Sequence, residues 1–318
     1  MLVGGIFSPE CVGVQNLAPK LGVAYMSSSG CASETFSTQS CNKYSFRLSP
    51  AGKQVTEATT AVEVQMFGKQ WGIIYPDYAL GQSTMQNTDA ALKKVGGTLA
   101  VKIAVPLGET NVTPYVTKIP TDGSIKALVV SMTGTDLPRT IQVMQQFGIP
   151  GKMQLITALG KEQYGGVYPA AVNGSIIAAT HTSDPQPGNQ FDQAYDQAFL
   201  AMAKGKDAQF LGPLGGPDHV TPGTTNGYTA YSTMTALKLA MRAANFTGKA
   251  DTAKLITALE NLNVKQGADF PAGDVIMNKA DHQGRQTAYL MKINGQQENV
   301  LQTIPAAQEP LIGNCQVK

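Results

Sequence analysis

Short apolar segments alternate with amphipathic ones over residues 1–183, and this alternation constrains the fold more than any other feature of the sequence. The apolar segments are apolar on both faces, as strands inside a parallel sheet are. Strand, helix and strand in repeated succession predict a doubly wound parallel sheet, so we place the chain in the α/β class. The predicted strands are MLVGGIF (1–7), VAYMSS (23–28), WGIIY (71–75), TLAVKIAV (98–105), ALVVSM (127–132), MQLITA (152–157) and SIIAATH (175–181).

Helices are predicted between these strands, and they dominate the chain after Ser183. A helix over 53–67 precedes WGIIY, and its apolar spacing predicts that one face packs on the sheet. Further helices are predicted over 136–147, 189–203, 225–245 and 251–262, and strands return at 274–278, 287–293 and 300–304. The residues predicted to face the core are Val55, Ala58, Val62 and Met66, then Phe191, Tyr195, Phe199 and Met202, then Tyr231, Met234, Leu237 and Met241.

The composition excludes several classes of protein. Charged residues make up 14% of the 318 residues and hydrophobic residues 42%, unlike a disordered, highly charged chain. The 24 Lys and Arg residues nearly balance the 22 Asp and Glu residues, and a net charge of +2 predicts no nucleic-acid partner. The length suggests two domains. No apolar run reaches the roughly 18 residues that span a bilayer.

The first ten residues, MLVGGIFSPE, lack the basic segment of a secretory signal peptide. They are better interpreted as a buried strand. A chain that starts within a strand starts within a domain, so we expect an N-terminal portion to be missing from this sequence.

Four cysteines, at positions 11, 31, 41 and 315, and three scattered histidines show no zinc-binding spacing, so no metal site is expected. Cys31 and Cys41 flank the polar loop CASETFSTQSC. A disulfide there would stabilise the fold by roughly 2–3 kcal/mol and would indicate an oxidising compartment. We predict this Cys31–Cys41 bond, and the alternative is two unpaired buried thiols. Cys11 and Cys315 either pair with each other or, for Cys11, with a cysteine in the missing N-terminal portion.

The usual catalytic motifs do not occur in the sequence. The serine-hydrolase pattern GxSxG, the phosphate-binding pattern GxxxxGK[ST] and the dinucleotide pattern GxGxxG are all absent. No pair of carboxylates stands out as acid and base. We therefore expect a binding protein without a cofactor rather than an enzyme.

Small hydroxyl-bearing residues follow three of the predicted strands. Ser8 follows the first strand, residues 27–30 follow the second, and residues 133–136 follow ALVVSM. Ligands of open α/β sheets bind outside the carboxyl ends of the strands, where hydroxyls and backbone N–H groups suit a carboxylate. Each cluster alone also fits a helix N-cap, but two clusters on consecutive strands favour a site.

In order and spacing, a set of segments resembles the periplasmic ligand-binding proteins of the leucine/isoleucine/valine type. The matching segments are GVAYMSSSG (22–30), YSFRLSP (44–50), WGIIYPDYALGQ (71–82), ALVVSMTGTD (127–136), MQQFGIPGKMQLITALG (144–160) and PAGDVIMNKADHQGRQTAYLMKING (271–295). No single motif is specific, but their order is. The family consists of substrate-binding subunits of ATP-driven importers, and it begins with two further βα units that this chain lacks.

The resemblance implies a type I periplasmic binding fold, in which two doubly wound parallel-sheet lobes are joined by a three-strand hinge that closes on the ligand. The crossovers are expected near Ser49–Pro50, Ser183–Asp184 and 271–280. Lobe 1 would then comprise 1–49 and 184–271. Lobe 2 would comprise 50–183 and 272–303, followed by a C-terminal tail over 304–318.

The resemblance also implies the ligand-binding residues. Ser8 takes the place of the family serine that holds a carboxylate, and Ser29, Gly30 and Cys31 take the place of the neighbouring small-residue loop. On the opposite lobe the hinge-tyrosine position falls on Leu80. Further expected contacts on that lobe are Asp77, Tyr78 and Thr133.

The family positions that hold an ammonium group fall on Gly134 and Leu159, neither of which can pair with a cation. A buried ammonium without a carboxylate partner is very unfavourable. We therefore expect an aromatic or aliphatic organic acid as the ligand. The alternative is an amino acid whose ammonium group meets Glu162 or Asp136.

The resemblance further implies a monomeric periplasmic protein that delivers its ligand to the membrane permease of an ABC importer. A ligand-sensing receptor domain with the same fold is a second alternative.

Overall fold

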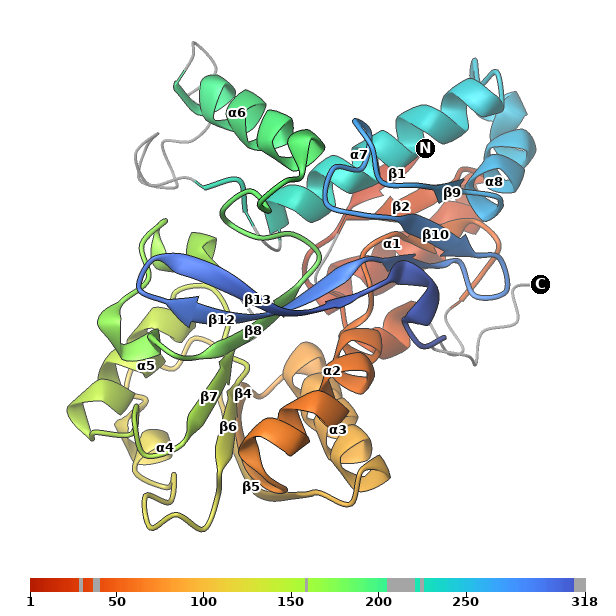
Figure 1. Cartoon of the computed structure of the whole chain (residues 1–318). Helices are drawn as coiled ribbons and strands as arrows, with labels where there is room; N and C mark the ends of the chain where they lie inside the picture. The colour runs from red at the N-terminus through yellow and green to blue at the C-terminus, as the bar shows by residue number, and fades with distance from the viewer. Residues whose placement is uncertain (29–30, 37–40, 158–159, 205–220, 224–225, 312–318) are drawn as a thin grey trace.

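Two β-sheets, each covered by helices, form two lobes that are seen one above the other in Figure 1. The computed structural model describes residues 1–28, 31–36, 41–157, 160–204, 221–223 and 226–311. Each sheet combines strands from the N-terminal part of the chain with strands from its C-terminal part. The chain therefore passes between the two sheets three times.

The first sheet has the strand order β1-β2-β3-β11-β10-β9. The strands β1 to β3 run parallel, and β11 joins β3 in parallel through the pair Arg47–Gln283. The strands β10 and β9 complete the sheet in antiparallel orientation. The strand bounds are β1 (Leu2–Gly4), β2 (Tyr25–Ser27), β3 (Ser45–Arg47), β9 (Asn263–Val264), β10 (Val275–Asn278) and β11 (Gln283–Gln286).

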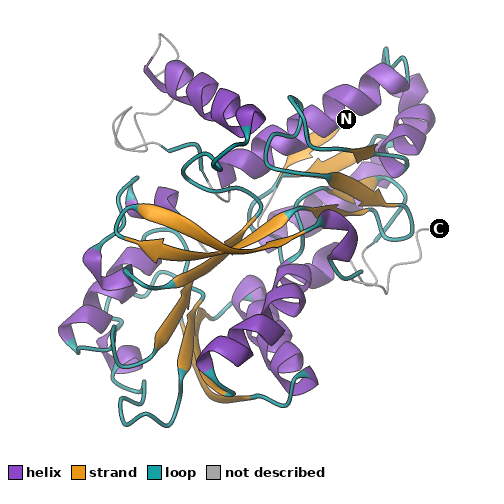
Figure 2. Ribbon diagram, in the orientation of Figure 1, coloured by secondary structure: helices purple, strands orange, loops and turns teal. Residues whose placement is uncertain are grey.

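Helices pack on both faces of the first sheet (Figure 2). One face, which carries Met26 and Phe46, packs against α7 and α8. The opposite face, which carries Tyr25, packs against α1. The helices of this lobe are α1 (Ser8–Leu21), η1 (Ser33–Phe36), α6 (Gln190–Lys204), α7 (Asn226–Ala243), η6 (Lys249–Asp251) and α8 (Thr252–Glu260).

The second sheet has the strand order β13-β12-β8-β7-β6-β4-β5. Its five strands from β4 to β8 are parallel, and β12 and β13 form an antiparallel hairpin at the β8 edge. The strand bounds are β4 (Gln70–Pro76), β5 (Thr98–Val105), β6 (Ala127–Val130), β7 (Gln154–Thr157), β8 (Ile176–Ala179), β12 (Ala288–Asn294) and β13 (Gln297–Ile304).

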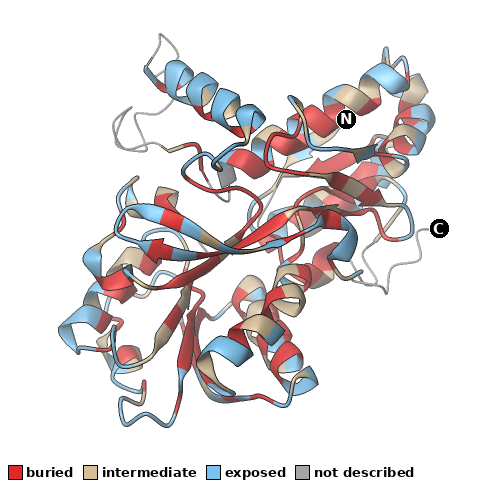
Figure 3. Cartoon of the chain, viewed as in Figure 1, coloured by how far each residue is buried: buried red, intermediate tan, exposed pale blue. Residues whose placement is uncertain are grey.

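The two faces of the second sheet bury different clusters. Trp71 and Ile73 pack with residues of α2 and α3, whereas Ile74 packs with residues of α4 and α5. Figure 3 shows the strands as largely buried and the outer helix faces as exposed. The helices of this lobe are α2 (Gly52–Phe67), α3 (Ala79–Lys94), α4 (Thr113–Val116), α5 (Asp136–Gln146), η2 (Lys161–Tyr164) and η3 (Ala170–Val172), and η7 (Ala306–Gln308) follows β13.

One expected lobe boundary differs from the structure. Residues 272–303 were expected to belong wholly to the second lobe, but β10 and β11 pair within the first sheet. The His282 ring stacks on Phe46, with ring centroids 3.9 Å apart, and this contact holds the β10–β11 turn against β3. The third passage between the sheets therefore falls between Gln286 and Ala288 rather than over 271–280.

The inward face of α2 also differs from the prediction. The apolar spacing predicted that Val55, Ala58, Val62 and Met66 face the core, but Met66 is 47% exposed. The structure instead buries a polar stripe that consists of Thr59, Thr60 and Glu63, together with Gln54 and Val64. Val64 packs on the sheet, but Thr59, Thr60 and Glu63 line a cavity instead of a close-packed core, which is why hydrophobic spacing misplaced the inward face.

The predicted core faces of α6 and α7 are only partly correct. Phe191 and Met202 on α6 and Met234 on α7 are exposed, whereas Leu237 is buried. On α6 the buried side chains include the two carboxylates Asp192 and Asp196, which face His181. The hydrogen bond between Asp192 and His181 therefore helps to orient this helix, together with the ring contacts of Tyr195 with His181 and Tyr228. In the described part of the chain, no helix is both long and apolar enough to cross a membrane.

Candidate ligand-binding site

A cavity of about 630 Å³ is lined by residues of both lobes. The first lobe contributes residues that follow β1, β2 and β3, and the second contributes residues beyond the carboxyl ends of β4, β6 and β7. This is the location at which open α/β sheets bind their ligands. The volume lies within the roughly 300–1,000 Å³ of small-molecule sites.

Arg47 forms part of the wall contributed by the first lobe, and the sequence reasoning did not single it out. Its side chain is 1% exposed, and its Nε donates to Gln283 Oε1 at 2.6 Å. Its Nη1 donates to the carbonyl oxygens of Cys31 and Ala32, at 3.0 and 3.2 Å, and the guanidinium stacks over the Phe36 ring. Burial lowers the pKa of Arg47 to about 10, so the group stays charged at neutral pH. The first-lobe wall therefore carries a cation whose hydrogen-bond partners are neutral and whose charge is stabilised by the nearby carboxylates of Glu34 and Asp281.

Ser8 supports this wall from behind instead of lining the cavity. It is buried at the start of α1, and its Oγ accepts a hydrogen bond from the backbone N–H of Ala32 at 3.0 Å. Cys31 lines the cavity. Ser29 and Gly30, the other expected residues of this loop, lie outside the described residues. Ser8 thus holds the backbone of Ala32 in place, and the neighbouring Cys31 faces the cavity.

The predicted disulfide between Cys31 and Cys41 is wrong. Cys31 is bonded to Cys11 on α1, with the two Cα atoms 6.4 Å apart, which is within the usual range for a disulfide. The alternative pairing of Cys11 with Cys315 is wrong for the same reason. The prediction relied on loop length along the chain, whereas α1 brings a more distant cysteine beside the loop in space.

Four of the residues expected on the second lobe line the cavity: Tyr78, Leu80, Thr133 and Gly134. The Tyr78 hydroxyl is hydrogen-bonded to the Thr133 side chain, and burial raises the pKa of Tyr78. Asp77 does not line the cavity, and its Oδ1 accepts a hydrogen bond from Gln82 Nε2 at 2.6 Å. Leu159 lies outside the described residues.

Asp136, an expected alternative anchor for an ammonium group, lines the cavity but is already neutralised. Its Oδ1 accepts a hydrogen bond from Arg139 Nη1 at 2.8 Å, and its Oδ2 accepts one from the backbone N–H of Gly108 at 3.1 Å. Glu162, the other expected anchor, lies on η2 and lines neither this cavity nor the second one described below. The walls of the main cavity are thus more favourable to an anion than to a cation.

Helix N-termini add to this preference. α2, α3 and α5 all begin at the cavity, where Gly52, Leu80 and Asp136 line it. The positive ends of helix dipoles and their free N–H groups stabilise anions. The three helix N-termini therefore contribute a positive field to the same cavity.

The cavity also extends beneath α2. Thr59, Thr60 and Glu63 line it from the helix, and Val129 and Ile156 line it from the sheet. Glu63 Oε2 accepts a hydrogen bond from Thr59 Oγ1 at 3.0 Å, and burial raises the pKa of Glu63 to about 7. The sequence reasoning missed these residues because a glutamate in the middle of a helix normally faces solvent.

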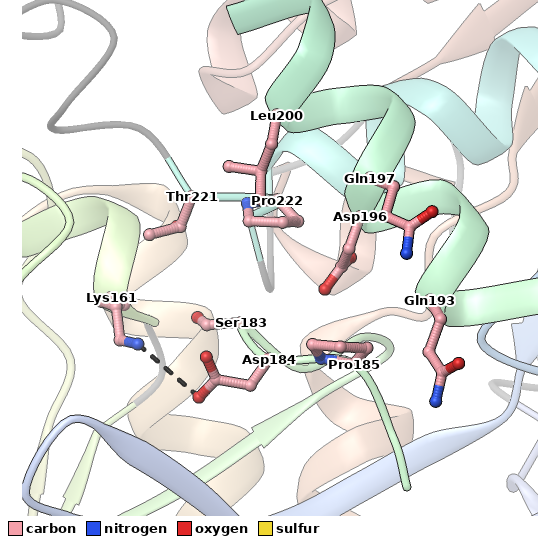
Figure 4. Close-up of a pocket in the computed structure, with 10 residues that line it drawn as sticks. All are labelled: Lys161, Ser183, Asp184, Pro185, Gln193, Asp196, Gln197, Leu200, Thr221 and Pro222. Atoms are coloured by element: carbon pink, nitrogen blue, oxygen red, sulfur yellow. Dashed lines mark ion pairs between the residues drawn. The ribbon is translucent and has the colours of Figure 1, made fainter. Parts of the chain in front are cut away.

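A second cavity, of about 340 Å³, lies where the passage from β8 meets α6 (Figure 4). Lys161 Nζ lies 3.7 Å from Asp184 Oδ2 at its rim. In Figure 4 the Asp196 carboxylate points from α6 toward Ser183 and Thr221. Burial, and then the nearby charges of Asp192 and Asp184, raise the pKa of Asp196 to about 8. This cavity therefore holds a buried carboxyl group whose Oδ1 lies 3.7 Å from His181 Nε2.

Three groups with metal-ligand spacing meet beside this second cavity. His181, Asp192 and Asp196 bring ligand atoms within 4.8 Å of one another, and within the described ranges no other such group occurs. His181 Nε2 lies 2.8 Å from Asp192 Oδ1, and His181 Nδ1 has no hydrogen-bond partner. A metal on Nε2 would leave a buried Nδ1–H without an acceptor, whereas metal-bound histidines normally donate that proton. The geometry thus favours a hydrogen bond between His181 and Asp192 that joins the interlobe passage to α6.

The two lobes and the cavity between them define a hinged solute-binding protein. A family model described as periplasmic binding protein matches residues 1–298. The chain belongs to this family, and both the predicted family and the predicted fold class are confirmed. Members of the family act as extracytoplasmic solute-binding proteins. A comparison with curated proteins gives no match.

Solved structures share the fold at low sequence identity. A periplasmic binding protein from Burkholderia mallei superposes with a TM-score of 0.80 and 19% identity, over 99% of this chain and 79% of that one. A solute-binding protein of an ABC transporter from R. palustris, in complex with benzoate, gives 0.78 and 17%, over 95% and 76%. The leucine-, isoleucine-, valine-, threonine- and alanine-binding protein from Brucella ovis gives 0.79 and 17%, over 99% and 80%.

Proposed function

We propose that the chain captures a small organic acid, aromatic or aliphatic, between its lobes and delivers it to the membrane permease of an ABC importer. The observation that carries the choice of an acid is the charge of the cavity wall. Arg47 is buried there and is bonded to neutral acceptors, whereas Asp136 is neutralised by Arg139. Glu34 and Asp281 also act on Arg47 electrostatically, and a ligand carboxylate would approach this cation from the cavity, whose wall Arg47 lines.

The proposed ligand contacts come from both lobes. The backbone around Cys31, held by Ser8 and Arg47, faces the carboxylate. Tyr78, Leu80 and Thr133 line the opposite wall and face the ring or alkyl chain. We further propose that the lobes divide after β3, after β8 and after β11, and that the protein acts as a periplasmic monomer without a cofactor.

Relatives with the same fold support a small-molecule ligand and leave two chemical classes in competition. One structure from R. palustris is described in complex with benzoate, and the Brucella ovis protein is named for five amino acids. The second candidate is therefore an amino acid. It is favoured by one observation, the Asp196 carboxyl group that points into the second cavity.

Calorimetric titration with benzoate, hexanoate, leucine and valine separates the two candidates. We expect the simple acids to bind at least ten times more tightly than the amino acids. Binding of leucine together with failure of both acids would overturn the first candidate. Leucine binding that is abolished by Asp196→Asn, with release of a proton from the wild-type protein, would establish the second.

A further inference from the structure

The inner part of the main cavity has an unusual lining. α2 turns Thr59, Thr60 and Glu63 toward the apolar sheet residues Val129 and Ile156. A buried polar group is stable only when it is hydrogen-bonded. Thr60 Oγ1 donates to the Thr56 carbonyl oxygen at 2.6 Å, and Thr59 Oγ1 donates to Glu63 Oε2. The hydroxyls therefore have partners, but Glu63 Oε1 has none among the described residues.

The two ends of this cavity lie far apart. The backbone N–H of Lys53, at the start of α2, donates to Ser33 Oγ at 3.0 Å, so this end of the helix abuts the loop that Arg47 holds. A helix rises about 1.5 Å per residue, which puts Glu63 roughly 16 Å from Gly52. One aromatic ring with a carboxylate cannot touch both ends.

Resting on the proposed function, we propose that the site takes an elongated acid whose far end carries a hydroxyl or amino group, and that Glu63 beneath α2 binds this group. The apolar wall of Val129 and Ile156 suits the middle of such a ligand. A hydroxyl or an ammonium group would donate to Glu63 Oε1, while Thr59 keeps Oε2 in place. Glu63 would then select among acids by their far end, whereas the loop at Cys31 recognises what they share.

Calorimetry with three series of straight-chain carboxylic acids tests this inference. The series are unsubstituted, hydroxylated at the terminal carbon and aminated at the terminal carbon, each with increasing chain length. We expect the terminal group to leave Kd unchanged in short acids. Once the chain is long enough to reach Glu63, the group should lower Kd about ten-fold, as one hydrogen bond to a buried group does. A terminal group that adds nothing at any length, while unsubstituted acids still bind, would overturn the inference.

Variants of α2 supply the control. Glu63→Leu should abolish the gain from both terminal groups, and Glu63→Gln should abolish the gain from the amino group while an amide oxygen still accepts from the hydroxyl. Glu57 lies on the same helix but outside the cavity, where its Oε1 is 2.9 Å from Lys94 Nζ. The control variant Glu57→Gln should therefore leave the gain from both terminal groups unchanged.

An unchanged gain in Glu63→Leu would overturn the inference. If Glu63→Leu does not fold, as judged by thermal unfolding, the amino series on Glu63→Gln decides. Failure of every acid to bind the wild-type protein would instead overturn the proposed function itself.

Discussion

Arg47 links the stability of the first lobe to the charge of the ligand site. Its guanidinium bonds Gln283 on β11 and the carbonyl groups of the loop at Cys31. It is therefore both a structural clamp between β3 and β11 and the cation of the cavity wall. The sequence did not predict either role, because the segment RLSP, which begins at Arg47, matches no motif of a binding site.

Substitution of Arg47 separates these two roles. We expect Arg47→Lys to bind organic acids several-fold more weakly, because lysine keeps the charge but cannot form the planar set of hydrogen bonds. Arg47→Met should lose at least ten-fold in affinity and about 2–4 kcal/mol of stability, since several buried carbonyls lose their donor. Titration calorimetry and urea unfolding measure the two effects. A folded Arg47→Met protein with wild-type affinity for acids would contradict the assigned role.

Glu309 makes stability depend on pH. It is buried after η7 and accepts a hydrogen bond from the backbone N–H of Gln286, and burial raises its pKa to about 8. The folded protein therefore keeps this proton up to about pH 8, whereas the unfolded chain loses it near pH 4. As the pH rises between these values, the unfolded state binds fewer protons than the folded state, so stability falls.

The variant Glu309→Gln mimics the protonated form. We expect it to be more stable than the wild-type protein by about 1–3 kcal/mol at pH 8 and equal to it near pH 4. Chemical unfolding at both pH values measures the difference. An equal difference at the two pH values would show that Glu309 does not titrate in this range.

At the scale of elements, the strands were predictable and the orientation of several helices was not. The segment ALVVSM became β6 because a strand buried on both faces needs a continuous apolar run, and TLAVKIAV became the edge strand β5, in which several positions are exposed. The spacing argument failed for α2 because it assumes that every inward helix face packs on a core. The helix α1 received no prediction: its residues follow the first strand without a strong apolar stripe, and Pro19 lies inside it.

The sequence also predicted only part of the candidate site, because local spacing does not determine how helices lie on a sheet. Thr133 was found because the carboxyl ends of parallel strands meet at one edge of a sheet, whereas Tyr78, Leu80 and Gly134 came from the family resemblance. Glu63 could not be found, because its place in the site depends on how α2 lies on the sheet. Distances between elements are set by tertiary packing, which local spacing does not encode.

The disulfide between Cys11 and Cys31 joins α1 to the loop after β2, and its contribution to the stability of the fold can be measured. It closes a loop with a sequence separation of 20 residues. Replacing both Cys11 and Cys31 by serine should lower stability by about 3 kcal/mol in the chain-entropy account. Peptide mapping of the unreduced protein should yield the Cys11–Cys31 peptide pair. Recovery of a Cys31–Cys41 pair would refute the assignment.

The whole molecule should close when it binds. The cavity walls belong to two lobes, and three segments of chain connect them, so ligand contacts on both walls favour an approach of the lobes. We expect small-angle scattering to give a smaller radius of gyration at saturating ligand than without ligand. An unchanged radius in the presence of a ligand confirmed by calorimetry would argue against closure on binding.

The pairing of β3 with β11 has a consequence for biogenesis. Arg47 and Gln283 are bonded neighbours although 236 positions separate them in the chain. A ribosome that makes the chain from its N-terminus must therefore complete nearly all of it before the first sheet can assemble. Contacts of such long range also slow folding. The parallel strands β4 to β8 of the second sheet, by contrast, are complete once residue 179 has been made, so the second lobe can begin to form well before the first.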